Sequence, residues 1–463
     1  MSTPPLAGST HGPDALRPLL AVVLEALHEG AVQRQGPLPT GGPHTVTTRL
    51  HTAAHPLLPD RGTGAEEALD TLVRALAEGA ADPADPLCAA HLHCPPLAVA
   101  AAADLAASAL NPSLDSWDQA PAATALETML TTTLAAEVYP HPQDTPPDAL
   151  VTTGGTEANQ LALLLAREQH GPVQLICGAN AHHSLARATW LLGLPTPQII
   201  PTPRGVLDPV ALHTALTEHP TADTPPRIVA ATAGTTDTGD IDPLTLIADL
   251  CDHHRTRLHV DAAYGGALLL SDTHRHRLTG LHRAHTVTLD LHKLGWQPVA
   301  AGLLAVRDPH DLTTLDHRAD YLNADDDTEA GLPDLLGRSL RTTRRPDILK
   351  IAVTLRALGR HGLAHLIDTV CARAHDLADL ITAHPDLQLY ATPTISTVLF
   401  RPTHATDHTI AHIRRTLLTE GRAVLGRAHA DGHLWLKATL LNPHTTADDL
   451  AGLLKLVEGH TPR

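Results

Sequence analysis

Lysine is almost absent from this sequence. Of the 33 lysine and arginine residues among 463, only four are lysines: Lys293, Lys350, Lys437 and Lys455. Arginine supplies almost all of the positive side chains, but a guanidinium cannot form an imine with an aldehyde, and a neutral amine can. The residues around Lys293, VTLDLH before it and LGW after it, indicate burial. Lys293 is therefore a candidate nucleophile, the alternative being an ion-paired or surface lysine.

Aromatic residues, cysteines and excess positive charge are also scarce. The chain has one Phe, four Tyr, four Trp and five Cys, and its formal net charge is −17. This acidity argues against a nucleic-acid partner, and scattered cysteines without CxxC spacing predict reduced thiols. No apolar run approaches the roughly 18–20 residues of a membrane span, and no signal peptide is visible. We therefore expect a cytoplasmic protein without a membrane partner.

Short apolar runs alternate with helical patterns through the middle of the chain, which predicts a three-layer α/β domain with a mostly parallel sheet. The runs are ALVTTGG, VQLICG, PQIIPTP, RIVAATAG, RLHVDAAYGG, TVTLDLHK and AGLLAVRD. Before them we expect an extended arm over residues 1–60 with one helix near 16–28, then helices over 64–79 and 97–138, the last broken at NPSLDSWDQAP. After them, STVLFRP, a helix and LWLKATLLNP predict a smaller α+β domain.

Polar residues follow four of the predicted strands, where open α/β sheets bind ligands. TTGGTEAN opens a helix and would present free N–H groups and a positive dipole end to a phosphate. Asp261 ends an apolar strand, where a carboxylate needs a positive partner. His182 and His183 follow another strand, although one histidine among 34 is weak evidence alone. With Lys293, these groups suit an aldehyde, a pyridinium nitrogen and a phosphate, which together describe pyridoxal phosphate.

The ordered motifs TTGGTEAN, AHHSLARA, VAATAGTTDTGDIDPL, HVDAAYGG, DLHK, RADYLN, RSLRTTRR and LLNPHTT resemble those of group II pyridoxal-phosphate-dependent decarboxylases of fold type I. The resemblance implies a large domain with a mostly parallel seven-stranded sheet between helices. It also implies a smaller α+β C-terminal domain and an N-terminal helical segment. The expected division is 1–95, packing on a dimer partner, then 96–335, binding the cofactor, and 336–463.

The resemblance also assigns roles to individual residues. Lys293 matches the lysine that binds the cofactor aldehyde, Asp261 the partner of the pyridine nitrogen, and His182 the histidine stacked on the ring. Tyr321, in RADYLN, matches the tyrosine of a mobile loop, and we expect it to protonate the substrate carbon. The implied cofactor-binding set is Gly155, Thr156, His182, Thr236, Asp261, Ala263, Asp290, His292 and Lys293.

The segment upstream of the sheet predicts the class of substrate. HLHCPP and NPSLDSWDQ resemble the branch that decarboxylates 2,4-diaminobutyrate, ornithine or lysine, although His93 stands where that branch commonly has Asn. His91, His93, Cys94 and Trp117 are the candidate pocket residues. A zinc site at HLHC is the alternative, but no second ligand cluster accompanies it, and we expect no metal.

Other functions stay open at this point. One alternative is decarboxylation of an aromatic or acidic amino acid. A second is oxidative deamination or β-elimination with the same cofactor. A third is a degenerate scaffold without activity. The presence of Lys293, Asp261, His182 and Tyr321 together favours decarboxylation of a small-molecule amino acid. The resemblance further implies a homodimer whose active sites lie at the subunit interface.

Overall fold

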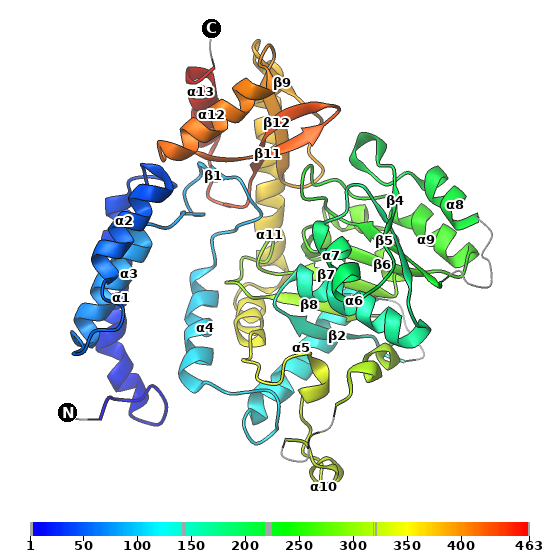
Figure 1. Ribbon diagram of the computed structural model, residues 1–463, viewed down its shortest axis with the longest axis horizontal. Coiled ribbons are helices and arrows are strands. Elements are labelled where there is room, and N and C mark those ends of the chain that lie inside the picture. The colour runs from blue at the N-terminus through cyan, green and yellow to red at the C-terminus, as the bar shows by residue number, and fades with distance from the viewer. Residues whose placement is uncertain (1–2, 141–144, 218–224, 318, 320–321, 462–463) are drawn as a thin grey trace. The chain divides into compact units, whose positions relative to one another are not determined.

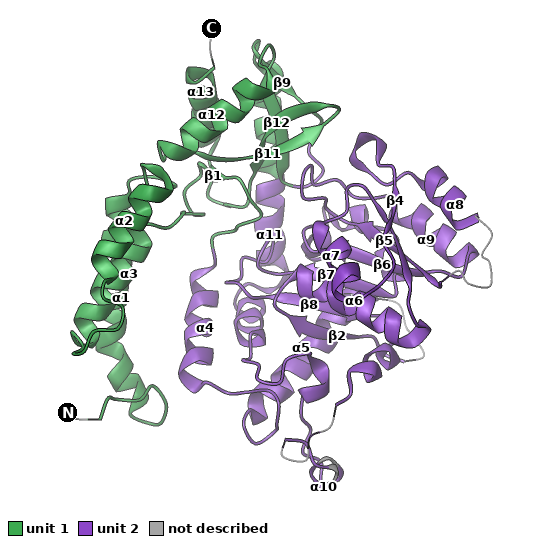
Figure 2. Cartoon of the chain, viewed as in Figure 1, with its two compact units in different colours: residues 1–95, 372–392, 396–463 green, residues 96–371, 393–395 purple. Residues whose placement is uncertain are grey.

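The computed structural model describes residues 3–140, 145–217, 225–317, 319 and 322–461. The chain forms two compact units, coloured separately in Figure 2. Unit 1 comprises residues 1–95, 372–392 and 396–463, and unit 2 comprises residues 96–371 and 393–395. In the part of the chain that is described, no helix is both long and apolar enough to cross a membrane.

Unit 2 contains a seven-stranded sheet in the order β2-β8-β7-β6-β5-β3-β4 (Figure 1). Only β8 runs antiparallel to its two neighbours, so the other six strands all point the same way. Their carboxyl ends therefore share one edge of the sheet. The strands are β2 (Asp148–Thr152), β3 (Gln174–Gly178), β4 (Gln198–Ile200), β5 (Arg227–Thr232), β6 (Arg257–Ala262), β7 (Thr286–Asp290) and β8 (Gly302–Val306).

The strands of this sheet are short, apolar and almost wholly buried, as expected for a parallel sheet covered by helices. The helices of unit 2 are α4 (Ala98–Leu110), α5 (Pro121–Val138), α6 (Gly155–His170), α7 (His183–Leu191), α8 (Pro209–Thr217), α9 (Leu244–His253) and α10 (Asp325–Glu329). Helix α6 packs through Leu161 and Leu165 over β2 and β8, and through Leu163 over β3 and β5. This packing fixes the N-terminus of α6 beside the end of β2.

Unit 1 combines helices from both ends of the sequence with a smaller sheet. Its helices include α1 (Gly12–Arg34), α2 (Gly42–Ala54), α3 (Ala65–Glu78), α12 (Asp407–Thr419) and α13 (Ala447–Gly459). Its sheet has the order β1-β11-β12-β10-β9, formed by β1 (Cys88–Ala89), β9 (Leu387–Leu389), β10 (Thr397–Pro402), β11 (Val424–Ala430) and β12 (His433–Thr439). The long α11 (Ile348–Ala383) contributes to both units and is interrupted at Gly359, whose φ of 62° favours glycine.

The α/β class, the seven strands of the large sheet and the helices over 64–79 and 97–138 agree with the sequence predictions. The N-terminal arm is more helical than predicted, because α2 occupies residues 42–54. This helix is rich in Thr and His, which have weak helix propensity, so the sequence pattern did not indicate it. The predicted boundary after residue 95 coincides with a change of unit, whereas residues 336–371 lie in unit 2. The three-domain division itself stays a prediction.

Candidate active site

The polar residues that follow the strands gather at the carboxyl edge of the sheet in unit 2. Asp261 lies near the end of β6, Asp290 ends β7, and the glycine loop follows β2. His182 is the N-cap residue of α7, which follows β3. The charges of Asp261, Asp290 and Lys293 all act on the pKa of the His182 imidazole, so these four groups are electrostatic neighbours.

The N-terminus of α6 forms a cradle of backbone N–H groups. The first backbone hydrogen bond of the helix runs from the N–H of Ala158 to the carbonyl of Gly154, 3.1 Å away, so the preceding N–H groups have no helical acceptor. A Cβ on Gly155 would lie 2.9 Å from the Cβ of Ala263 and 3.3 Å from Oδ2 of Asp290. Only glycine permits this close approach, which keeps the cradle open next to β6 and β7.

Lys293 lies against a carboxylate just after β7. Its Nζ is 3.0 Å from Oδ2 of Asp290, and Nε2 of His292 is 3.4 Å from the same oxygen. The other oxygen, Oδ1 of Asp290, is buried and has no hydrogen-bond partner among the described residues. Burial, opposed by the charge of Asp290, lowers the pKa of His292. The amine of Lys293 therefore lies next to a carboxylate, Asp290, whose Oδ1 can still accept a hydrogen bond.

Asp261 is held in place through both of its oxygens. Oδ1 accepts from the N–H of Ala263 at 3.1 Å, and Oδ2 accepts from Nδ2 of Asn159 at 2.8 Å. The carbonyl oxygen of Asn159 accepts from Oγ1 of Thr288 at 2.7 Å and contacts Nε2 of His259 at 2.9 Å. A flipped Asn159 amide would place its oxygen against a carboxylate that only accepts, so Asp261 fixes the amide orientation.

The orientation of Asn159 in turn fixes the tautomer of His182. The second N–H of the Asn159 amide donates to Oγ of Ser184 at 2.9 Å, which leaves the hydroxyl proton free for Nδ1 of His182, 2.8 Å away. The backbone N–H of Ser184 also donates to this Nδ1, at 3.3 Å. A nitrogen that accepts from two donors carries no proton itself, so the neutral imidazole has its proton on Nε2.

Burial keeps the histidines of this network uncharged. It lowers the pKa of His182, although the negative charge of Asp261 partly opposes the shift. It lowers the pKa of His259 to about 4, because the ring is fully buried. His259 is therefore a neutral partner that connects Asn159 to Oγ1 of Thr286, at 2.9 Å. The carboxylate of Asp261 is thus the charged member of a largely neutral hydrogen-bonded chain.

The remaining predicted residues fall into three groups. Thr156 and Thr236 lie at the carboxyl edge as exposed residues, and Thr235 beside the latter is buried. The candidate pocket residues are divided between the units: Trp117 belongs to unit 2, while His91, His93 and Cys94 belong to unit 1. Tyr321 lies outside the described residues. No group of three or more His, Cys, Asp or Glu side chains in the described ranges is arranged to hold a metal ion.

Sequence reasoning missed the buried network behind Asp261, formed by Asn159, Ser184, His259 and Thr288. Two signals were available. Asn159 and Ser184 belong to the TTGGTEAN and AHHSLARA motifs, and His259 lies two residues before Asp261 on one strand, so both side chains face the same way.

The chemistry of these groups fits pyridoxal phosphate. The α6 cradle suits a phosphate, the anchored carboxylate of Asp261 suits a protonated ring nitrogen, and Lys293 supplies the amine for an aldehyde. Gly155 lies beside Asp290, and its missing Cβ leaves space for the cofactor there. Among the described residues, the buried Oδ1 of Asp290 also has no hydrogen-bond partner. The fold and site together therefore define a pyridoxal-phosphate-dependent enzyme.

Comparisons with known proteins identify its family. A family model described as the pyridoxal-dependent decarboxylase conserved domain matches residues 51–403, and the chain belongs to this family. It is 40% identical over 421 residues to an L-2,4-diaminobutyrate decarboxylase of Rhizobium meliloti, covering 88% of this chain and 84% of the relative. It is 31% identical over 437 residues to another from Acinetobacter baumannii, covering 87% and 85%.

A solved structure from Vibrio parahaemolyticus agrees with this assignment. It is the glutamate decarboxylase domain of a diaminobutyrate-pyruvate transaminase and L-2,4-diaminobutyrate decarboxylase, 30% identical, with a TM-score of 0.86 over 98% of this chain and 97% of that one. A rice TDC structure with pyridoxal phosphate and tryptamine, 23% identical with a TM-score of 0.88 over 98% and 99%, shares the fold. The chain is thus an amino acid decarboxylase, a carboxy-lyase that uses pyridoxal phosphate.

Proposed function

We propose that the chain decarboxylates L-2,4-diaminobutyrate, releasing carbon dioxide and leaving 1,3-diaminopropane. The similarity that carries this proposal is the 40% identity to the Rhizobium meliloti enzyme over 88% of the chain, well above the identity to relatives acting on acidic amino acids. Ornithine and lysine, which differ from this substrate by extra methylene groups, are the next candidates. Selectivity for 2,4-diaminobutyrate, which carries two ammonium groups and one carboxylate, would require a pocket that rejects these longer side chains.

Pyridoxal phosphate, when bound, supplies an electron sink for the pair left behind when the carboxylate departs. Lys293 would hold its aldehyde carbon through the ε-amine, the α6 N-terminus with Gly155 and Thr156 would hold its phosphate, and Asp261 would face its ring nitrogen. Ala263, Thr236 and His292 would complete the surroundings. The hydrogen bonds that anchor both oxygens of Asp261 support its role, because a carboxylate held in this way keeps its charge at one fixed point.

His182 would orient the substrate carboxylate. With Nδ1 occupied by two donors from Ser184, the imidazole has its only proton on Nε2, and a neutral Nε2–H donates to a carboxylate without a strong ion pair. This matters because a full ion pair with imidazolium would stabilise the substrate's negative charge, which must disappear when carbon dioxide leaves. Positioning the scissile bond is then the main task of this side chain.

We also propose that Tyr321 protonates the substrate carbon, on the strength of its place in RADYLN. The proposed assembly is a homodimer with the active site at the interface, as the family resemblance implies. A cytoplasmic location is supported by the absence of disulfides among the described cysteines, which are free thiols, four of them buried.

The direct test is turnover by purified protein supplied with pyridoxal phosphate. Trapped carbon dioxide and the amine product are measured for 2,4-diaminobutyrate, ornithine, lysine, glutamate, aspartate, tyrosine and tryptophan, with ammonia and hydrogen peroxide assayed in parallel. We expect the highest kcat/KM with 2,4-diaminobutyrate, and equal molar amounts of carbon dioxide and 1,3-diaminopropane. A preference for glutamate or aspartate would overturn the proposed substrate. Ammonia and peroxide in place of amine would overturn the proposed reaction.

A further inference from the structure

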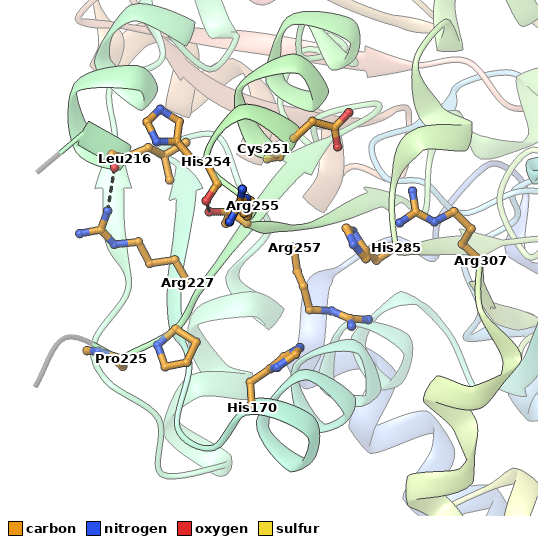
Figure 3. Close-up of a pocket in the computed structure, with 13 residues that line it drawn as sticks. His170, Leu216, Pro225, Arg227, Cys251, His254, Arg255, Arg257, His285 and Arg307 are labelled. Carbon is orange, nitrogen blue, oxygen red and sulfur yellow. Dashed lines mark hydrogen bonds between the residues drawn. The ribbon is translucent and has the colours of Figure 1, made fainter. Parts of the chain in front are cut away.

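A cavity of about 780 Å³ opens at the other edge of the large sheet, where the parallel strands begin (Figure 3). Arg227 and Arg257 are the first residues of β5 and β6, and His285 directly precedes β7. Arg307 follows the last residue of β8, and because β8 is antiparallel it reaches this same edge. His170 ends α6, the helix whose opposite end forms the candidate phosphate cradle. The cavity is therefore separate from the active site.

The lining of this cavity is strongly basic in a chain whose net charge is −17. Among the residues that the structure describes, the lining contains four arginines, three histidines and one carboxylate: Arg227, Arg255, Arg257, Arg307, His170, His254, His285 and Asp252. That carboxylate is already bound, because Oδ2 of Asp252 accepts from Arg283 at 2.5 Å. Three of the four arginines lie within or next to strands at this edge, so the sheet itself brings the positive charge together.

In the described part of the chain, two of these arginines have no carboxylate partner for their guanidinium charge. Arg257 forms an ion pair with Asp311, and Arg227 donates to the carbonyl of Leu216 (dashed in Figure 3). Among the described residues, Arg255 and Arg307 have no ion-pair partner, and the Arg307 guanidinium donates to a backbone carbonyl, that of Arg283. The backbone of Arg255 also has a φ of 53°, in the left-handed region where a helix normally ends with glycine.

The positive charge of the arginines also affects the pKa values of the neighbouring histidines, His285 and His170. Burial, together with the charges of Arg307 and Arg257, lowers the pKa of His285 to about 4. Burial and the charge of Arg257 likewise lower the pKa of His170. These rings are neutral near pH 7, so they add hydrogen-bonding capacity beside the arginines without adding to their mutual repulsion.

We propose that this cavity binds a small polyanion with at least two negative charges, held by the guanidinium groups of Arg255 and Arg307. Guanidinium groups bind phosphate and carboxylate through paired N–H donors, so both chemistries suit the site. The volume lies within the roughly 300–1,000 Å³ of small-molecule sites. The proposal does not depend on which amino acid is decarboxylated, because it concerns the opposite edge of the sheet.

The test is calorimetric titration of the holoenzyme with inorganic pyrophosphate and, separately, with citrate, at constant ionic strength. Using the holoenzyme keeps the cofactor's own phosphate site occupied. We expect saturable binding of at least one probe, with a dissociation constant about tenfold weaker for each arginine removed, as in Arg255→Gln and in Arg255→Gln/Arg307→Gln. The matched control is Arg61→Gln/Arg356→Gln, which removes two exposed arginines outside the cavity.

Each outcome bears on the proposal. Binding of pyrophosphate alone identifies a phosphorylated ligand class, and binding of citrate alone identifies a polycarboxylate. Absence of saturable binding by either probe at millimolar concentration overturns the proposal, as does equal binding by the cavity variant and the control. Cofactor absorbance equal to that of the wild type verifies that the variants fold. If the double variant does not fold, the single change Arg255→Gln, at an exposed residue, is compared with the wild type instead.

Discussion

The substitution Asn159→Asp tests the hydrogen-bonded chain behind Asp261 with almost no change of shape. It replaces an amide that donates to Oδ2 of Asp261 at 2.8 Å with a carboxyl group at the same point. With the two charges about 4 Å apart in an effective dielectric of about 20, their repulsion is about 4 kcal/mol. That energy corresponds to a rise of about three units in the pKa of the introduced carboxyl group.

The effect of this change should depend on pH in a defined direction. Below the raised pKa the introduced carboxyl is protonated and still donates to Asp261, so the variant loses only the bond to Ser184, worth about 1 kcal/mol. The folded-state pKa lies above the unfolded value, so stability relative to the wild type is retained at low pH. It is lost as the pH rises from about 4 towards about 7, by up to about 4 kcal/mol. Cofactor affinity should fall over the same interval.

The assay compares thermal unfolding midpoints and the dissociation constant of pyridoxal phosphate for wild type and variant between pH 5 and pH 8. The matched control is Asn159→Leu, which keeps the branching and the number of side-chain heavy atoms but adds no charge, so it should lack the loss of stability that repulsion between two carboxylates causes as the pH rises. If Asn159→Asp also lacks this loss, then the amide does not face an ionised Asp261. The tautomer inferred for His182 would lose its basis in that case.

Four further changes test the site and the opposite edge of the sheet. Lys293→Arg should keep the positive charge near Asp290 yet abolish the visible absorbance of bound cofactor; a retained band would refute the role of the amine. Asp261→Ala should weaken cofactor binding and lower kcat by at least about a hundredfold, as for loss of one preorganised electrostatic partner, and near-normal turnover would contradict this. Tyr321→Phe should bind cofactor normally but, with dissolved oxygen as the oxidant, form aldehyde, ammonia and hydrogen peroxide in place of amine, so unchanged amine yield would remove Tyr321 from the mechanism. The folded-state pKa of His285, lowered from 6.5 to about 4, means that stability is lost as pH falls between these values, by about 3 kcal/mol, and His285→Gln should flatten that loss in urea unfolding.

The sequence predicts the large sheet well because its strands are continuous apolar runs with turn residues between them. β7 ends in Asp290 and β6 has Asp261 as its second-last residue, and six of the seven strands point the same way, so strand-end residues converge without any knowledge of loop structure. The place of Asp261 and of Lys293 in one region therefore follows from parallel pairing alone. The helix α2 could not be predicted in the same way, since its Thr and His residues have weak helix propensity and none of them is buried.

The parts that the sequence does not reveal are those that depend on contacts between distant residues. Asn159 and Asp261 are 102 positions apart, and the donor count that fixes the tautomer of His182 requires knowing which atoms meet. The same holds for the basic cavity, because Arg307 lines the same cavity as Arg255 only through the reversed direction of β8. In a chain with so many arginines, neither residue stands out by type. In a parallel sheet, every strand that ends at the candidate active site begins at the other edge, so residues before a strand are as informative as those after it.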